Sequence, residues 1–247
     1  MIDIQAVSAS RGLDWVSKGF GLFRRNALIW IAMLIIFLTL TTLLSLVPFV
    51  GSIAALMLQP VLVGGMQSGC RALGKGEELR IEHLFDGFHE NTKQLALVGL
   101  YAALGYLLIG LLIALAVGSS VLSLEFLDRI GDLPDLIVGS AFFGMLIAAL
   151  FGMLLAVPIA MATWFAPTLI VLHNLPALSA MKLSFAGCLR NMLPFLIYGL
   201  IVLLLGFVAM IPAGLGLLVL GPTLVGSVYA GYQDIFSQRI EPPRDGT

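Results

Sequence analysis

Four long stretches of the chain carry no Asp, Glu, Lys or Arg, and they constrain the fold more than any other feature. They cover residues 26–70, 94–124, 136–181 and 191–233. A membrane-spanning helix needs about 20 consecutive, mostly apolar residues. Over the whole chain only 11% of residues are charged, whereas an average soluble domain carries about 25%. The sequence therefore predicts an all-α, polytopic helical membrane protein.

Two of the uncharged stretches are long enough for two helices each, because proline and glycine interrupt them. Pro48 and Gly51 divide the first stretch, and Pro212 and Gly214 divide the last. Each of these stretches predicts a hairpin with a short turn, and the two middle stretches predict one crossing each. The six expected transmembrane helices cover about 27–47, 51–70, 95–118, 140–171, 192–211 and 214–232.

The positions of the basic residues predict the orientation. Of the 13 Lys and Arg residues, 12 lie before, between or after the spans on one side. The opposite side has two uncharged turns and an acidic loop at 118–135. Short loops rich in Lys and Arg remain in the cytoplasm, so we expect a multi-pass protein of the bacterial inner membrane with both termini cytoplasmic.

Two short motifs recur three times in the same order. A Phe and an Asn six residues apart precede the first span of each unit, and a Pro-x-Leu-Val/Ile string lies in its last span. The marker residues are Phe20, Asn26 and Pro60, then Phe85, Asn91 and Pro167, then Phe185, Asn191 and Pro222. This order predicts repeat units at about 11–75, 79–178 and 179–238 within a single integral membrane domain, 1–247.

All three units begin on the predicted cytoplasmic side, so they are expected to be three parallel hairpin repeats with short cytoplasmic interfacial helices. The second unit is about forty residues longer than the others. Residues 136–172 as one helix would be ~55 Å long at 1.5 Å per residue, which exceeds the roughly 30 Å hydrocarbon core. Either Pro158 kinks this helix, or residues 136–157 form a re-entrant or interfacial segment.

Small residues recur at every fourth position of the fourth span. They are Ser140, Gly144, Ala148, Gly152, Ala156 and Ala160. Small side chains at this spacing let helix backbones approach closely inside lipid. We expect these residues to form a helix-packing face. A contact between helices of one chain is favoured over a contact between two copies of the chain.

The well-defined parts of the spans contain no ionisable side chain, which argues against an ion-coupled carrier. A cytoplasmic loop holds the one ionisable cluster of interest, namely Glu82, His83, Asp86, His89 and Glu90. Two histidines one turn from an aspartate could present ligands to a divalent metal. The apolar spacing of Ile81, Leu84, Phe85 and Phe88 favours an interfacial helix instead. We therefore expect no catalytic residue, metal or cofactor. His173 shows no partner in the sequence.

The segment before the first span also has an amphipathic pattern. Its apolar face comprises Trp15, Val16, Gly19, Phe20 and Phe23. Such a helix can rest in the headgroup layer, where basic side chains attract anionic lipid. The alternative is that it belongs to a cytoplasmic collar of three short helices that docks a partner or senses lipid.

With its three Phe-to-Asn segments, the string Leu84-Phe85-Asp86-Gly87-Phe88 and the Pro-x-Leu-Val/Ile repeats, the chain resembles uncharacterised bacterial six-span inner-membrane proteins over about residues 11–236. It is more distantly similar to the membrane domain attached to some glycerophosphodiester phosphodiesterases. The resemblance implies a fold and a location, since these motifs are architectural.

The expected function is that of a non-enzymatic scaffold, whose partners are membrane lipids, another envelope protein or a second copy of itself. A permease or channel-like protein for a neutral or amphiphilic solute is the alternative. A membrane-embedded enzyme, which would need the Glu82–Glu90 cluster, comes third. The net charge of −1 leaves no basic surface for nucleic acid.

Overall fold

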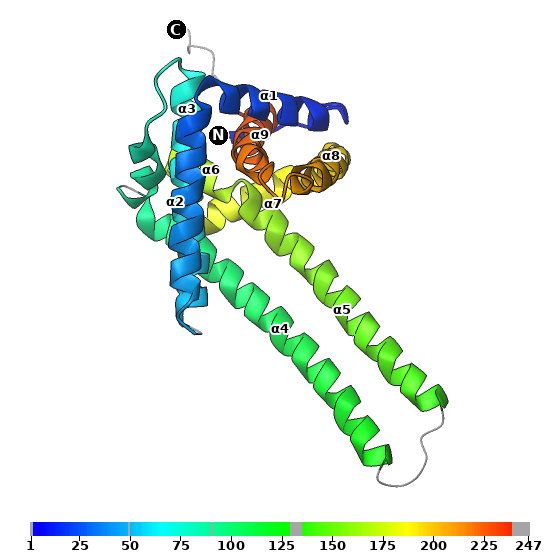
Figure 1. Ribbon diagram of the computed structural model, residues 1–247. Helices are drawn as coiled ribbons and strands as arrows, with labels where there is room; N and C mark the ends of the chain where they lie inside the picture. The colour runs from blue at the N-terminus through cyan, green and yellow to red at the C-terminus, as the bar shows by residue number, and fades with distance from the viewer. Residues whose placement is uncertain (1, 49, 90, 129–134, 239–247) are drawn as a thin grey trace, which may run out of the picture. The chain divides into compact units, whose positions relative to one another are not determined.

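The computed structural model describes residues 2–48, 50–89, 91–128 and 135–238, with side chains described outside 119–142 and 237–238. Its regular secondary structure is helical except for two short strands. Its elements are β1 (Ile2–Ile4), α1 (Arg11–Arg25), α2 (Ala27–Ser45), α3 (Val50–Gly74), the 3₁₀ helix η1 (Ile81–Phe88), α4 (Thr92–Asp128), α5 (Asp135–Trp164), α6 (Ala166–His173), α7 (Ala177–Arg190), α8 (Met192–Met210), α9 (Leu217–Ile235) and β2 (Phe236–Gln238) (Figure 1).

Among the described residues, five helices are long and apolar enough to cross a membrane. They are Ala27–Ser45, Val50–Gly74, Thr92–Gly118, Phe143–His173 and Met192–Met210. Large apolar side chains on them are exposed, for example Leu28 at 78% and Leu204 at 65%. A helix that is apolar all round and still exposed is typical of contact with lipid. These helices therefore support the prediction of an all-helical membrane protein.

The expected sixth span, 214–232, coincides largely with α9, which is not among these five. The reason is its place in the fold. α9 packs against α1, α2, α3 and α8, and its buried residues include Thr223, Gly226 and Ser227. Small and hydroxyl-bearing residues permit close packing between helices, but they lower the hydropathy that marks a lipid-facing span.

Contacts divide the chain into two compact units, Met1–Leu100 with Met161–Thr247, and Tyr101–Ala160. The second unit is an antiparallel pair made from parts of α4 and α5. A Cβ atom added at Gly105 of α4 would lie 2.6 Å from Ile159 Cδ1 of α5, and Gly152 of α5 packs against Ile113 of α4. Short side chains on each helix thus accommodate branched side chains on the other.

Within the first unit, α1 packs against α9 and α8, η1 against α3, and α7 against α6. Figure 1 shows α1 crossing α9, and α2 running beside α3. α1 and α9 cross closely because Gly19 has no side chain. A Cβ atom added at Gly19 would lie only 2.6 Å from the backbone nitrogen of Ser227.

The apolar face of α1 is therefore mostly an internal packing surface. Trp15 is 1% exposed, Val16 7% and Phe23 7%. The interpretation that this whole face rests among lipid headgroups is wrong, because α8 and α9 cover it. Phe20 differs from the rest of the face and is 42% exposed.

The long helix expected at 136–172 is divided near its C-terminal end. α5 continues through Pro158 to Trp164, and the break lies at Phe165, ahead of Pro167. There the Ser184 hydroxyl takes the place of a backbone partner. It accepts from the Phe165 N–H (2.9 Å) and donates to the Met161 carbonyl (2.6 Å). A side chain inserted into the helical hydrogen-bond ladder is a recognised cause of kinks.

Candidate functional site

The two ends of the described chain meet in a small antiparallel ribbon. β1 pairs with β2 in the register Ile2 with Gln238, Asp3 with Ser237 and Ile4 with Phe236. Sequence reasoning missed this ribbon. The apolar-polar-apolar order of Ile2, Asp3 and Ile4 was the available signal, but three residues are too few to distinguish a strand from a loop. The ribbon holds the start of the chain beside the last turn of α9.

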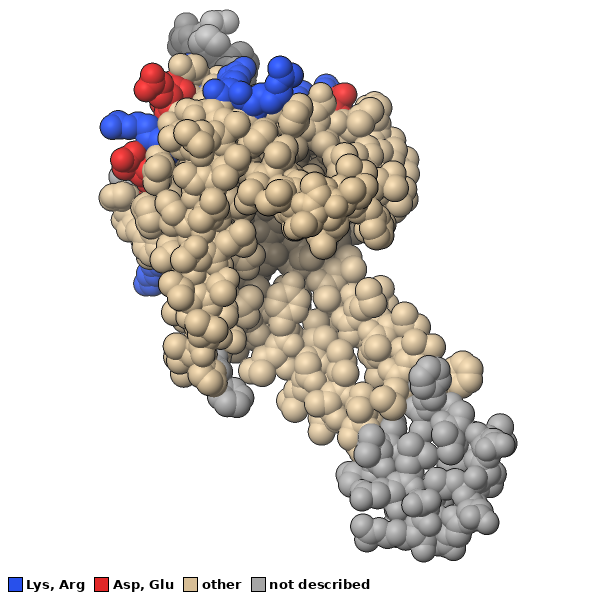
Figure 2. All heavy atoms as spheres, in the orientation of Figure 1, with Lys and Arg blue, Asp and Glu red and all other residues tan. Residues whose placement is uncertain are grey.

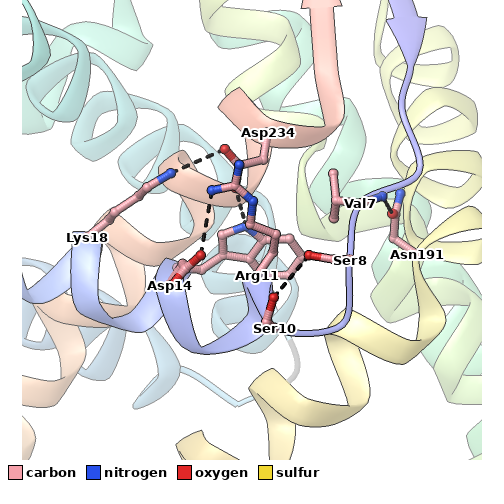
Figure 3. A network of polar contacts seen from close by, with 9 residues as sticks. Val7, Ser8, Ser10, Arg11, Asp14, Lys18, Asn191 and Asp234 are labelled. Carbon is pink, nitrogen blue, oxygen red and sulfur yellow. Dashed lines mark hydrogen bonds and ion pairs between the residues drawn. The ribbon is translucent and has the colours of Figure 1, made fainter.

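Asp234, in the last turn of α9, is the centre of a polar network with α1 (Figure 3). Its carboxylate accepts from Trp15 Nε1 (2.9 Å) and Lys18 Nζ (3.2 Å), and Arg11 Nε lies 3.8 Å away. The Asp234 side chain is only 13% exposed, whereas those of Arg11 and Lys18 are 43% and 47% exposed. A carboxylate at a helix C-terminus opposes the helix dipole, and these three donors compensate for its position.

Asn191 forms a second link, between the N-terminal segment and the junction of α7 with α8. The residue is 1% exposed. Its Oδ1 accepts from the Val7 N–H (2.8 Å) (Figure 3). Its Nδ2 donates to the carbonyls of Gln5 and Gly187 (both 2.9 Å). Every amide atom of this side chain therefore has a backbone partner.

The three repeated asparagines lie at corresponding places, each directly before a long helix. The carbonyls of Asn26, Asn91 and Asn191 accept from the backbone N–H four residues later, at 3.2, 3.0 and 3.2 Å. Their side chains differ in their contacts, and Asn91 Nδ2 donates to Asn174 Oδ1 at 3.2 Å. The recurring position is thus a junction between two helices.

The repeated Phe and Pro residues lie on corresponding helices of the three predicted repeats, but their environments differ. Phe20 and Phe85 are exposed and Phe185 is half-buried, while Pro60 is half-buried in α3, Pro167 is buried in the first turn of α6 and Pro222 is buried in α9. The structure does not bring these nine residues together into one site. They mark element boundaries and packing positions.

The small residues of α5 are only partly a packing face. Gly152 is buried, Ala148 and Ala156 are half-buried, and Gly144 and Ala160 are exposed. The contact of Gly152 with Ile113 lies within one chain. The side chain of Ser140 lies outside the described residues.

The loop cluster is distributed among structural contacts. Leu84 and Gly87 of η1 are buried, and Gly65 of α3 abuts the Leu84 carbonyl, whereas Phe85 and Phe88 are exposed. His83 Nδ1 accepts from the Arg80 N–H (3.0 Å), and Asp86 Oδ2 accepts from Ser68 (2.7 Å). Within the described residues, no three His, Cys, Asp or Glu side chains lie close enough together to hold a metal ion.

His173 has a partner that the sequence did not reveal. Its Nε2 lies 2.6 Å from the Tyr232 hydroxyl, with ring centroids 5.8 Å apart. The pair joins α6 to α9, which are 59 residues apart along the chain at these positions. Such a contact depends on tertiary packing and has no local signature.

A groove of about 760 Å³ lies between α1, α8, α9 and the turn that joins the last two. Its walls are apolar except for Ser17 and Thr223, and the Thr223 hydroxyl donates to the Val219 carbonyl of its own helix (2.7 Å). Ligand pockets commonly have volumes of about 300–1,000 Å³. The groove therefore has the size of a ligand site, with walls suited to an apolar ligand.

The helical spans and the short helices packed on them define a multi-pass membrane protein. A probable inner membrane protein of Burkholderia thailandensis is 33% identical over 232 residues, covering 91% of this chain and 82% of that protein. The chain belongs to the same family of uncharacterised bacterial inner membrane proteins. No family model and no solved structure matches it.

Proposed function

We propose that the protein is a non-enzymatic scaffold of the bacterial inner membrane that binds lipid or an envelope partner through its cytoplasmic short helices. The observation that carries this proposal is that α1, η1 and α7 each pack on a helix of another predicted repeat. The polar contacts of α1 with Asp234 join it to the last turn of α9. A distant relationship to the membrane domain of glycerophosphodiester phosphodiesterases is part of the proposal and concerns architecture alone.

The order of these contacts supports three parallel repeats closed in a ring. η1 of the second repeat packs on α3 of the first repeat, and α7 of the third packs on α6 of the second. α1 of the first repeat packs on α9 of the third. In this proposal α9 is the sixth span, enclosed by its neighbours. The ring would hold the three short helices on the same side of the membrane.

Charge placement supports the proposed orientation. Figure 2 shows most of the visible Lys, Arg, Asp and Glu side chains gathered over the end where α1 and the last turn of α3 lie, while the visible surface of α2 is uncharged. Charged groups are costly within a bilayer. We therefore propose that this end lies outside the bilayer. Because loops rich in Lys and Arg remain in the cytoplasm, we propose that it is the cytoplasmic end, together with both termini.

Cysteine labelling tests the orientation. Native Cys70 and Cys188 are 0% and 3% exposed, so they will contribute little background. We expect Glu125→Cys to react with a membrane-impermeant maleimide on intact spheroplasts, and Lys75→Cys to react only in inverted vesicles. Labelling of both from the same side would overturn the topology.

The scaffold role is tested by purification in mild detergent with identification of bound lipids and proteins. We expect a defined lipid or envelope partner at constant stoichiometry. If the purified protein retains neither a defined lipid nor an envelope protein, the proposal is contradicted. The competing metal-enzyme hypothesis predicts that alanine at His83, Asp86 and His89 lowers metal content, and we expect metal content to stay unchanged.

One hollow bears on the permease alternative. It lies between α2 and α3, has a volume of about 360 Å³ and is lined partly by Thr41, Ser45, Ser52 and Gln59. The hydroxyls of Thr41 and Ser45 donate to carbonyls of their own helix, both at 2.8 Å. Because these groups are used within α2, a structural role is favoured over a solute pathway.

A further inference from the structure

The groove between α1, α8 and α9 is bounded by residues that packing leaves uncovered. On the α1 side, Leu13 is 57% and Phe20 42% exposed. On the hairpin side, Val208 is 60% and Ile211 80% exposed. An apolar groove with exposed apolar margins is typical of a ligand or partner site.

α1 is held firmly as one wall of this groove. A Cβ at Gly12 would lie 2.8 Å from the backbone nitrogen of Tyr198, and one at Gly19 would lie 2.6 Å from that of Ser227. These contacts set α1 directly on α8 and α9, and Asp234 ties its polar face to the end of α9. The groove is thus formed by backbone packing and does not depend on flexible side chains.

A cation lies at one border of the groove. The Arg24 guanidinium is 5.8 Å from the centre of the Phe20 ring, and Phe20 lines the groove. Among the described residues, no carboxylate forms an ion pair with Arg24. The neighbouring cations are engaged, since Lys18 pairs with Asp234 and Arg25 donates to the Leu73 carbonyl (2.8 Å).

An apolar groove with a cation at its edge matches the two parts of an anionic phospholipid. We propose that the groove holds an acyl chain of such a lipid, with its phosphate bound by Arg24. Arginine binds phosphate oxygens by charge-assisted hydrogen bonds, and Phe20 supports both the chain and the guanidinium. This inference rests on the proposed membrane location of the protein and specifies the lipid partner of α1.

The test uses the full chain reconstituted in phosphatidylcholine vesicles containing a minor fraction of phosphatidylglycerol, then extracted in mild detergent. Native mass spectrometry counts the lipids that remain bound. We expect one retained phosphatidylglycerol, preferred over the more abundant phosphatidylcholine. A basic side chain at a membrane surface contributes ~1 kcal/mol, so we expect Arg24→Gln to lower this preference about fivefold.

A second variant tests the apolar part. Val219→Trp places a large ring in the groove and should abolish retention of either lipid. Two matched controls should bind as the unmodified chain does: Lys75→Gln, which removes an exposed cation after α3, and Leu203→Trp, on the face of α8 outside the groove. Gel filtration and circular dichroism confirm that each variant is folded.

Equal retention of the two lipids by the unmodified chain would overturn the proposal. So would unchanged retention in folded Arg24→Gln and Val219→Trp, or equal loss in the two controls. A dimer in place of a bound lipid would assign the groove to a second copy of the chain. The labelling test of topology is independent, so a failure here can be distinguished from a failure of the membrane orientation.

Discussion

Replacing Ser184 with alanine removes the hydroxyl that lies between α5 and α6. Ser184 is 0% exposed, and its oxygen bonds both the Phe165 N–H and the Met161 carbonyl. If the break at Phe165 persists in the variant, both backbone groups lose their hydroxyl partner in a buried site. Cys188 Sγ approaches the Met161 carbonyl only at 3.6 Å, so it can compensate weakly at best.

The magnitude follows from these two groups. Leaving a buried donor or acceptor unpaired costs about 1–3 kcal/mol, and the small change in volume adds little. We expect Ser184→Ala to lower the free energy of unfolding by about 2–4 kcal/mol. If α5 and α6 instead straightened into one helix, the Phe165 N–H would bond Met161 directly and the cost would be below ~1 kcal/mol.

Unfolding by sodium dodecyl sulfate in mixed micelles, followed by circular dichroism, measures this difference. Ser179→Ala is the matched control, because Ser179 lies exposed on the same helix; it should change stability by less than ~0.5 kcal/mol. Hydrogen exchange at the Phe165 amide should quicken in Ser184→Ala alone. Equal stability of the two variants, with the Phe165 amide still protected, would refute the role assigned to the hydroxyl.

Three further predictions concern packing and accessibility. Gly19→Ala should destabilise by about 1–3 kcal/mol because its Cβ meets the backbone of α9, whereas Gly21→Ala, with open space around it, should stabilise by about 0.5–1 kcal/mol; equal effects in micelle unfolding would contradict this. Asn191→Ala leaves the Val7 N–H without its acceptor, so limited proteolysis should cut the N-terminal segment sooner, and unchanged cleavage would count against the link. Burial raises the pKa of the Cys188 thiol to about 12; since the thiolate is the reactive form, maleimide at pH 8 should label it only after unfolding, and rapid labelling of the folded protein would be the contrary result.

Local sequence signals located most of the helices. The uncharged stretches predicted the long helices, and Pro48 and Pro212 lie in the turns between α2 and α3 and between α8 and α9. Proline lacks a backbone N–H and glycine adopts turn conformations freely, so both act on their own stretch of backbone. Such effects can be deduced from neighbouring residues alone.

The contacts of the candidate site could not be deduced in this way. The periodicity of α1 identified an apolar face, but the same pattern suits lipid and a neighbouring helix, and only the tertiary structure shows α9 covering Trp15. Asp234 and Asn191 likewise acquire their partners from segments far away in the chain. The positions of such polar side chains show no periodicity from which their partners could be predicted.

The sequence by itself determined that the chain resides in a membrane as helices, because transfer of apolar side chains from water depends on composition. Tertiary structure decided which faces pack against protein, and it placed a helix break at Phe165, which no local signal had indicated. The physical reason is that a helix inside lipid gains no hydrophobic advantage from one apolar neighbour over another. Close approach at Gly19 and the hydrogen bonds of Ser184 make that choice, and both depend on where distant segments lie.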